Sequence, residues 1–204
     1  MVKKNKKLKV FKSLNNKKVI EILKAGGVGV IPTDTLYGII GLAKNKETVE
    51  RIYQLRQRNP HKPFIILISS LNDLKKFNLS LSKVVLSFLS KIWPEKISVA
   101  LPCKDKKMSY LHRGTKSLAF RFPPKKSLLS LLKKVGPLVA PSANPEGQKP
   151  AATIKEAQKY FSDKVDFYVD GGKINSLPST LIKIEKDNKI SVLREGEITI
   201  NFID

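Results

Sequence analysis

Apolar residues along the chain follow two spacings, one typical of amphipathic helices and one typical of buried strands. Where they recur every three or four residues, the spacing predicts helices over residues 16–24, 47–58, 81–93, 127–135 and 153–161. Short apolar or alternating runs predict strands over residues 28–32, 64–68, 96–101, 117–122, 137–140 and 165–169. Two final runs, 179–185 and 190–194, predict a hairpin that turns at Asp187 and Asn188.

Local signals refine several of these segments. Thr153 and Glu156 have the spacing of a capping box, which begins the last predicted helix. In residues 117–122 apolar and polar positions alternate, which places Arg121 away from the bulky apolar side chains of its strand. Residues 112–114 have no periodic pattern and are predicted as a flexible loop.

Strands that alternate with helices and end in a hairpin are typical of an α/β fold with a mixed sheet. The sequence has no internal repeat, no low-complexity linker and no second set of elements, so we expect one domain over residues 16–204. We expect a twisted, open mixed sheet with helices packed on it. Residues 1–15 carry a lysine cluster without strong periodicity and are predicted as a basic N-terminal arm, with a ragged edge strand as the alternative.

Composition narrows the possible functions. The chain has 204 residues, 41% of them hydrophobic, and 39 Lys and Arg against 17 Asp and Glu, a net charge of +22 that favours a polyanionic partner or substrate. One cysteine and two histidines argue against a disulfide framework or a structural metal centre and fit a reducing compartment. No apolar run approaches the roughly 20 residues that cross a bilayer. We therefore expect a cytoplasmic protein with no membrane contact.

Arginine is rare among these basic residues. The six arginines are Arg51, Arg56, Arg58, Arg113, Arg121 and Arg194, and all the other basic residues are lysines. Because the planar guanidinium matches phosphate and carboxylate groups, each arginine in a lysine-rich chain is a candidate for a specific contact. Four of the six lie in segments that also carry other candidate site residues.

Several familiar catalytic signatures are absent. The sequence contains no P-loop, no Rossmann glycine pattern, no CxxC pair, no HExxH and no GxSxG. Polar clusters follow predicted strands instead. The segment PTDTLYG, residues 32–38, comes directly after a buried strand, where α/β sheets collect their ligands. An ordinary Asx or Ser/Thr turn is the alternative interpretation.

Two more clusters contain groups that bind anions. Arg56, Arg58 and Lys62 place three cations near the end of a helix, either as a phosphate clamp or as a surface cap that complements the helix dipole. Ser142 and Asn144 follow the strand at 137–140 and offer a hydroxyl and an amide that can hold phosphate or carboxylate oxygens.

Taken in order, these clusters resemble the YrdC-like family of threonylcarbamoyl-adenylate synthases, in its short, single-domain bacterial form. The resemblance runs from residue 17 to the end of the chain. The matching segments are PTDTLYG (32–38), RQR followed by HKPF (56–64), IWPEKISVALP (92–102), SLAFRFP (117–123), APSANPEG (140–147), DGG (170–172), PSTLIKI (178–184) and LREGEIT (193–199). The ordered series is far more specific than any one segment.

The resemblance implies a fold and a reaction. The fold would be a twisted open α/β sheet with a large, positively charged concave face. The protein would be a nucleotidyltransferase that joins L-threonine, bicarbonate or CO2 and ATP into threonylcarbamoyl-AMP and pyrophosphate. A downstream threonylcarbamoyl transferase complex would use this product to make N6-threonylcarbamoyladenosine in tRNA. Mg²⁺ would enter with ATP, with no dedicated protein site, and we expect a monomer.

The resemblance also assigns roles by position. The family's catalytic Lys, Arg, Ser and Asn correspond to Arg56, Arg58, Ser142 and Asn144. Threonine would contact Thr35, Arg121 and Ser179, with Arg121 on its carboxylate. The nucleotide would lie along Arg58, Lys62, Ser117, Ser142, Asn144 and Arg194. The chain departs from the family pattern at Arg56, where lysine is usual, and at Leu67, where some relatives have a histidine that contacts threonine.

Two other functions remain open at this level. One is an RNA-binding module of the same fold, for tRNA or double-stranded RNA, with weak or no synthase activity; the net charge and the Arg56 departure motivate it. The other is transfer of a carbamoyl-adenylate to a different acceptor, as in hydrogenase maturation proteins, which is less favoured because those proteins carry additional domains.

Overall fold

The computed structural model describes residues 8–185 and 189–200. The strands are β1 (Val10–Phe11), β2 (Gly29–Pro32), β3 (Tyr37–Leu42), β4 (Ile65–Leu67), β5 (Ile97–Pro102), β6 (Ser117–Arg121), β7 (Leu138–Val139), β8 (Phe167–Val169), β9 (Thr180–Ile184) and β10 (Ile190–Arg194). The α-helices are α1 (Lys17–Lys24), α2 (Lys46–Arg56), α3 (Lys83–Ile92), α4 (Ser109–His112), α5 (Lys126–Val135) and α6 (Ile154–Phe161). Short 3-10 helices cover Leu71–Phe77, Lys106–Met108 and Ser162–Lys164. None of the helices in the described residues is both long and apolar enough to span a membrane.

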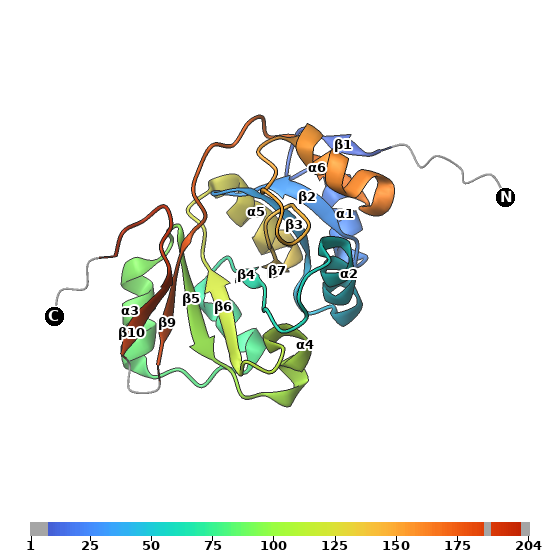
Figure 1. Cartoon of the computed structure of the whole chain (residues 1–204). Helices are drawn as coiled ribbons and strands as arrows, with labels where there is room; N and C mark the ends of the chain where they lie inside the picture. Colours follow the sequence, from blue (N-terminus) through green and yellow to red (C-terminus); the bar gives the residue numbers. More distant parts are fainter. Residues whose placement is uncertain (1–7, 186–188, 201–204) are drawn as a thin grey trace.

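The described strands form one ten-stranded sheet in the order β1-β8-β2-β3-β7-β4-β6-β5-β9-β10 (Figure 1). The sheet is mixed: it contains parallel pairs, such as β2 with β8 and β4 with β6, and antiparallel pairs, such as β2 with β3 and β5 with β6. Figure 1 shows β1 and the hairpin β9–β10 at opposite ends of the molecule. The predicted α/β fold with an open mixed sheet is confirmed.

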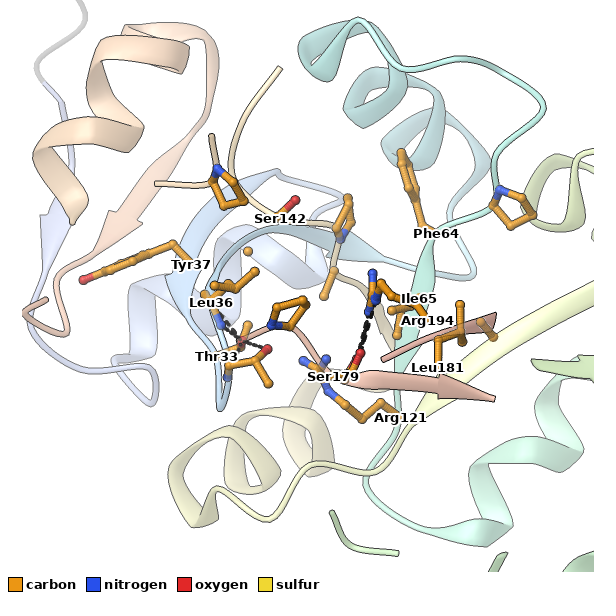
Figure 2. Close-up of a pocket in the computed structure, with 18 of the residues that line it drawn as sticks. Thr33, Leu36, Tyr37, Phe64, Ile65, Arg121, Ser142, Ser179, Leu181 and Arg194 are labelled. Atoms are coloured by element: carbon orange, nitrogen blue, oxygen red, sulfur yellow. Dashed lines mark hydrogen bonds between the residues drawn. The ribbon is translucent and has the colours of Figure 1, made fainter. Parts of the chain in front are cut away.

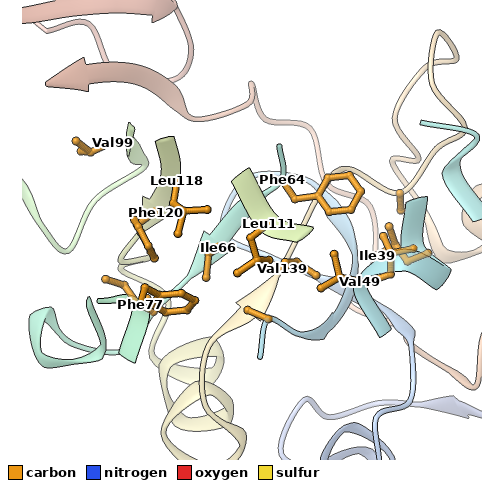
Figure 3. Packing of buried hydrophobic residues seen from close by; sticks show 14 of the residues in the cluster. Ile39, Val49, Phe64, Ile66, Phe77, Val99, Leu111, Leu118, Phe120 and Val139 are labelled. Carbon is orange, nitrogen blue, oxygen red and sulfur yellow. The ribbon is translucent and has the colours of Figure 1, made fainter. Parts of the chain in front are cut away.

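Helices cover both faces of this sheet because its central strands are apolar on both sides. In β2, Val30 belongs to a larger hydrophobic core and Ile31 to a smaller one, and Ile66 and Leu67 of β4 divide in the same way. Helices α2, α3, α4 and α6 contribute to the larger core, part of which is drawn in Figure 3, whereas α1 and α5 contribute to the smaller core.

Strand β3 is missing from the sequence prediction. It contains Gly38 and Gly41, and glycine lowers the strand propensity of an otherwise apolar run. The packing explains why Gly41 is there: a Cβ at this position would lie 2.2 Å from Thr48 Cγ2 of α2. The close approach of α2 and β3 therefore requires glycine at this position. The two glycines interrupt the apolar pattern from which a strand would be predicted.

Two predicted boundaries are wrong. The helix expected over residues 47–58 ends at Arg56, because Gln57 adopts a left-handed conformation with φ of 48°. Arg58 therefore lies in the following loop. The start of the flexible loop predicted at 112–114 is also wrong, because His112 is buried and is the last residue of α4. The next residue, Arg113, is held by an ion pair, with its Nη2 2.8 Å from Glu50 Oε1.

The N-terminal helix cap of α6 differs in one hydrogen bond from the predicted capping box. Thr153 Oγ1 accepts the Glu156 N–H at 3.3 Å, as predicted. The Glu156 carboxylate, however, accepts the N–H of Ala152 at 2.8 Å. The helix still begins at the predicted place.

The N-terminal residues that the structure describes pack onto the domain. Strand β1 pairs in parallel with β8, and Leu14 is buried in the smaller core. Residues 10–14, counted above with the basic arm, thus form an edge strand and a core contact. Residues 1–7 of that arm lie outside the described residues, as does the turn at 187–188 of the hairpin β9–β10, whose strands are confirmed.

Candidate active site

A cavity of about 810 Å³ opens on one side of the sheet, a volume within the usual range for small-molecule sites. Its wall is built from the turns that follow β2 and β7, the end of α2, and residues of β4, β6 and β9 (Figure 2). The two turns are joined by backbone hydrogen bonds, among them one from the Ala143 N–H to the Tyr37 carbonyl oxygen at 2.8 Å. Segments far apart in sequence therefore meet around one space.

Among the residues that the structure describes, those that form the wall of this cavity together carry positive charge. The wall includes Arg56, Arg58, Arg121, Lys149, Lys183 and Arg194, and no Asp or Glu is among the residues that form it. The polar residues of the lining include Thr33, Thr35, Ser117, Ser142 and Ser179, which carry hydroxyl groups. Six positive side chains without a carboxylate in the wall indicate a site for a polyanion.

Arg56 is almost wholly buried beneath the turn that follows β7. Its Nε–H donates to the Asn144 carbonyl oxygen at 2.9 Å, and its Nη2 lies 3.4 Å from both Ser142 Oγ and Asn144 Oδ1. Burial lowers the pKa of Arg56 to about 10, and the charge of Arg58 acts in the same direction, so the guanidinium stays protonated at neutral pH. Its Nη1 is buried and has no hydrogen-bond partner among residues 8–185 and 189–200. A buried donor of this kind is satisfied when a ligand supplies an acceptor.

Glu146 holds the loop that follows α2. Its Oε2 accepts the Asn59 N–H at 2.6 Å, and its Oε1 lies 2.9 Å from Lys62 Nζ and 3.6 Å from Arg58 Nη1. The hydrogen bond from Asn59, followed by the contact with Lys62, lowers the pKa of Glu146 to about 2. Arg58 lines the cavity, whereas Lys62 lies outside its wall with 58% of its side chain exposed.

Arg121 and Asp34 form a buried ion pair at another part of the wall. Arg121 Nη2 donates to Asp34 Oδ1 at 3.0 Å, and the two side chains are 5% and 2% exposed. Burial lowers the pKa of Arg121, and the charge of Asp34 opposes this shift. Arg121 Nε and Asp34 Oδ2 are buried without hydrogen-bond partners. This pair is the point where the cationic wall is locally neutralised.

Arg194 and Ser179 lie beside Arg121 in Figure 2. The Nη2 of Arg194 donates to the Ser179 carbonyl oxygen at 2.7 Å, and Ser179 Oγ lies 2.8 Å from the buried Ser98 Oγ. Partial burial lowers the pKa of Arg194, and the charges of Arg121 and Arg58 lower it further. Three arginines from separate segments thus repel one another, and a bound anion would relieve that repulsion.

The turn after β2 is organised by a threonine hydroxyl. Thr33 Oγ1 donates to the Leu36 carbonyl oxygen at 2.6 Å and accepts the Thr35 N–H at 3.2 Å. The two threonine hydroxyls lie 3.4 Å apart, and both residues line the cavity. The segment is therefore the Ser/Thr turn of the alternative interpretation and, at the same time, part of the site.

The structure brings together eight of the ten predicted site residues on the cavity wall: Thr35, Arg56, Arg58, Ser117, Arg121, Ser142, Ser179 and Arg194. Asn144 lies behind Arg56, where its amide donates to the carbonyl oxygens of Pro145 at 2.9 Å and Gln148 at 2.7 Å. Lys62 is the other exception. The role of each residue toward a substrate stays a prediction.

Two cations of the wall, Lys149 and Lys183, are absent from the sequence prediction. Lys183 had a usable signal, because Leu181 and Lys183 alternate with buried residues along β9 and so share a face. Lys149 follows the APSANPEG segment by two residues and is one lysine among many, so nothing in the pattern distinguishes it.

A second cavity of about 890 Å³ adjoins the first and shares Thr115, Ser117 and Lys183 with it. Its wall contains Lys104, Lys106, Lys116 and Lys183. The carboxylate of its wall, Glu185 Oε1, lies 2.7 Å from Lys183 Nζ. The cationic surface therefore continues beyond the main cavity.

The donor set of the site suits a metal that arrives with its substrate. Across the described residues, no group of three or more His, Cys, Asp or Glu side chains could hold a metal ion. The described wall of the main cavity supplies cations and hydroxyls instead of carboxylates. A divalent cation here would take its ligands from phosphate oxygens, as Mg²⁺ commonly does.

The fold and the site define a single-sheet α/β protein with a cationic cavity for a small polyanionic substrate. Residues 21–196 match the Sua5_yciO_yrdC family, which is described as "Telomere recombination". The chain belongs to this family.

Three relatives show how far the similarity extends. A protein of Methanocaldococcus jannaschii, provisionally named threonylcarbamoyl-AMP synthase, is 33% identical over 97% of this chain and 96% of its own length. The threonylcarbamoyl-AMP synthase of Bacillus subtilis is 31% identical over 87% of this chain, which spans about half, 52%, of that protein. The structure of Pyrococcus abyssi Sua5 complexed with L-threonine has a TM-score of 0.81 and 25% identity, and covers 93% of this chain and 57% of that one.

Proposed function

We propose that this protein is a threonylcarbamoyl-AMP synthase, which makes threonylcarbamoyl-AMP and pyrophosphate from L-threonine, bicarbonate or CO2 and ATP. The similarity to synthases over almost the whole chain supports the reaction. The observation that carries the proposal is the cavity wall, in which six cations and several hydroxyls converge without a carboxylate. A downstream threonylcarbamoyl transferase complex would use the product to modify tRNA.

The reaction depends mainly on electrostatic stabilisation of charged groups. The neutral amine of threonine adds to the carbon of CO2, forms an N–C bond and loses a proton to give a carbamate. With an α-amino pKa of about 8, a fraction of the amine is neutral at physiological pH. A carbamate oxygen then attacks the α-phosphorus of ATP, the new O–P bond forms, and the bond to the β-phosphate oxygen breaks as pyrophosphate leaves.

Both partners in the second step are anions, so the wall must neutralise charge and hold them in line. Arg56 and Arg58, with Ser142 and Asn144, would hold the triphosphate and the leaving pyrophosphate. The unpartnered Nη1 of Arg56 is available for a phosphate oxygen. Its other nitrogen atoms are fixed on Asn144 and Ser142, so the free N–H has a defined direction.

The threonine would lie at the other part of the wall, beside Thr35, Arg121 and Ser179. Asp34 offsets the charge of Arg121 in this part, which suits an amino acid better than a triphosphate. Ser117 and Arg194 would contact the nucleotide between these two parts. Lys62 could reach a phosphate only by leaving Glu146.

Mg²⁺ would accompany ATP and add positive charge on the phosphate oxygens. The residues of the described wall fit this arrangement because they leave the metal to the nucleotide. The chain's own contribution is the placement of fixed guanidinium and hydroxyl groups around the phosphates.

The proposal is tested by pyrophosphate release. The purified chain is incubated with ATP, Mg²⁺, labelled bicarbonate and each amino acid in turn, and we expect release and a labelled adenylate with threonine. Arg58→Ala and Ser142→Ala should lower the rate by about a hundredfold or more. Arg51→Ala, which removes a cation remote from the cavity, serves as the control. Pyrophosphate release that is indifferent to threonine would contradict the proposal.

A second candidate function is RNA binding, and the second cavity favours it. Its lysines extend the cationic surface next to the active site, where a phosphodiester backbone could bind. We expect RNA affinity to fall steeply with salt and to weaken in Lys104→Ala and Lys106→Ala, with the synthase rate unchanged. Absence of RNA retention at physiological salt would exclude this function.

A further inference from the structure

We propose that Arg113, outside the cavity, is a positioning residue for the Arg56–Arg58 clamp, acting through an aromatic stack formed by Tyr53 and Phe64. The kinetic test of this inference rests on the proposed function. Its second test, the affinity for pyrophosphate, requires only that the site binds phosphate groups of a nucleotide. None of the predicted site residues belongs to the stack.

The stack is continuous from Arg113 to the cavity. The Arg113 guanidinium carbon lies 3.8 Å from the centre of the Tyr53 ring. The Tyr53 ring stacks on Phe64 with centroids 4.0 Å apart and planes inclined by 21°. Phe64 lines the cavity, and the guanidinium carbons of Arg56 and Arg58 lie 6.0 Å and 5.9 Å from its ring centre. The guanidinium groups of both clamp arginines therefore lie near the Phe64 ring, at the end of the stack opposite Arg113.

Tyr53 also holds the clamp through its backbone and its hydroxyl. The Arg58 N–H donates to the Tyr53 carbonyl oxygen at 3.1 Å, and the Tyr53 hydroxyl donates to the Lys62 carbonyl oxygen at 2.9 Å. Both ends of the segment from Arg58 to Lys62 are thus fixed to one residue. A displacement of the Tyr53 ring would move Phe64, the segment and the arginines together.

An ion pair with α2 holds the Arg113 side chain in turn. Its Nη2 lies 2.8 Å from Glu50 Oε1 of α2, and its side chain is 14% exposed. Its backbone adopts a left-handed conformation with φ of 51°, directly after α4. A planar cation held over a buried ring is attracted by the ring quadrupole, and the effect is stronger when the pair is desolvated. Lysine could keep the charge beside Glu50 but could not reproduce the planar contact.

The test compares Arg113→Ala, Arg113→Lys and a matched control, Arg51→Ala. Arg51 lies on α2, the helix that carries Glu50 and Tyr53. It also forms an ion pair, with its Nη1 2.6 Å from Asp166 Oδ2, but this pair lies outside the stack. For each variant the KM values for ATP and threonine, kcat, the melting temperature and the affinity for pyrophosphate are measured.

We expect Arg113→Ala to raise the KM for ATP and weaken pyrophosphate binding by about tenfold, with the KM for threonine within about twofold of the parent. Arg113→Lys should recover part of this loss, and Arg51→Ala should lower the melting temperature without changing the KM for ATP. Equal effects of Arg113→Ala and Arg51→Ala, or a lower melting temperature with unchanged pyrophosphate affinity, would overturn the inference.

A second variant and the pyrophosphate-binding measurement keep the experiment decisive. If Arg113→Ala does not fold, Glu50→Gln removes the counter-ion that holds Arg113 over Tyr53, and a smaller change in the KM for ATP and in pyrophosphate affinity, again without a change in the KM for threonine, is expected from it. If the parent protein releases no pyrophosphate with threonine, the proposed function fails while pyrophosphate affinity still tests the positioning role. A parent that binds pyrophosphate as weakly as Arg113→Ala would count against the stack.

Discussion

Arg121 of the cavity wall is paired with Asp34, which does not line the cavity; Nη2 and Oδ1 are 3.0 Å apart, and both side chains are almost fully buried. The arginine expected to receive the threonine carboxylate therefore already has a carboxylate partner. Among the described residues, its Nε has no hydrogen-bond partner, and neither has Asp34 Oδ2. The pair fixes the guanidinium before any substrate arrives and still leaves N–H donors for a ligand.

Asp34→Asn should lower the free energy of unfolding by about 3–5 kcal/mol, because it leaves the buried Arg121 charge without a counter-ion. Saturating threonine should stabilise this variant more than the parent, since its carboxylate would replace the lost charge. Urea unfolding and melting temperature, each with and without threonine, measure both effects.

A double variant serves as the control. Asp34→Leu with Arg121→Met removes both charges and should recover much of the stability while it abolishes threonine binding. Equal stabilisation of Asp34→Asn and the parent by threonine would contradict a carboxylate site at Arg121.

Arg56→Lys tests whether the clamp needs a charge or a guanidinium. Lysine lacks the planar fork that spans Asn144 and Ser142, so we expect a loss of about 1–3 kcal/mol in the free energy of unfolding. The positive charge is kept, so pyrophosphate release should stay within about tenfold of the parent, whereas Arg56→Met should lose at least about a hundredfold. If Arg56→Lys is as inactive as Arg56→Met, the fork itself is required.

The pKa of Glu146, lowered to about 2 from an ordinary 4.5, predicts a pH dependence of stability. A carboxylate whose pKa is lower in the folded than in the unfolded state stabilises the fold above about pH 4.5, and this stabilisation is lost as the pH falls to about 2. Glu146→Gln should therefore be less stable than the parent at pH 7, and the difference should shrink between those two pH values.

Glu21→Gln on the exposed side of α1 is the matched control for this experiment, since the Glu21 carboxylate lies 3.9 Å from Lys17 and is 59% exposed. We expect it to leave unfolding nearly unchanged. A constant difference between parent and Glu146→Gln over the whole pH range would exclude the proposed ionic role of Glu146.

The fold was largely predictable because its elements are set by apolar periodicity. The two cores divide β2 and β4 residue by residue, and such strands read as continuous apolar runs. Boundaries set by a single backbone angle were not predictable. The positive φ of Gln57 ends α2 two residues early, and no residue preference marks that position.

The candidate site was predictable where residue type restricts function. Arg56, Arg58, Arg121 and Arg194 stand out in a lysine-rich chain, and all four reach the cavity. The sequence could not show which of the basic side chains form ion pairs with carboxylates. The pairing of Arg121 with Asp34 depends on contacts between remote segments, and so does the ion pair of Lys62 with Glu146.

Gly196 allows the segment after β10 to pack closely against Pro178 and Ser179, and its replacement should displace that segment. A Cβ at this position would lie 2.3 Å from the Pro178 carbonyl oxygen and 2.5 Å from Ser179 carbonyl carbon, so backbone must move. The next residue anchors the segment: the Glu197 N–H donates to the Pro178 carbonyl oxygen at 2.9 Å. Gly196→Ala should therefore pull Arg194 from Ser179, lower the free energy of unfolding by about 1–3 kcal/mol and raise the KM for ATP. The exposed Glu195→Ala is the control, and equal kinetics for the two variants would show that the segment does not shape the cavity.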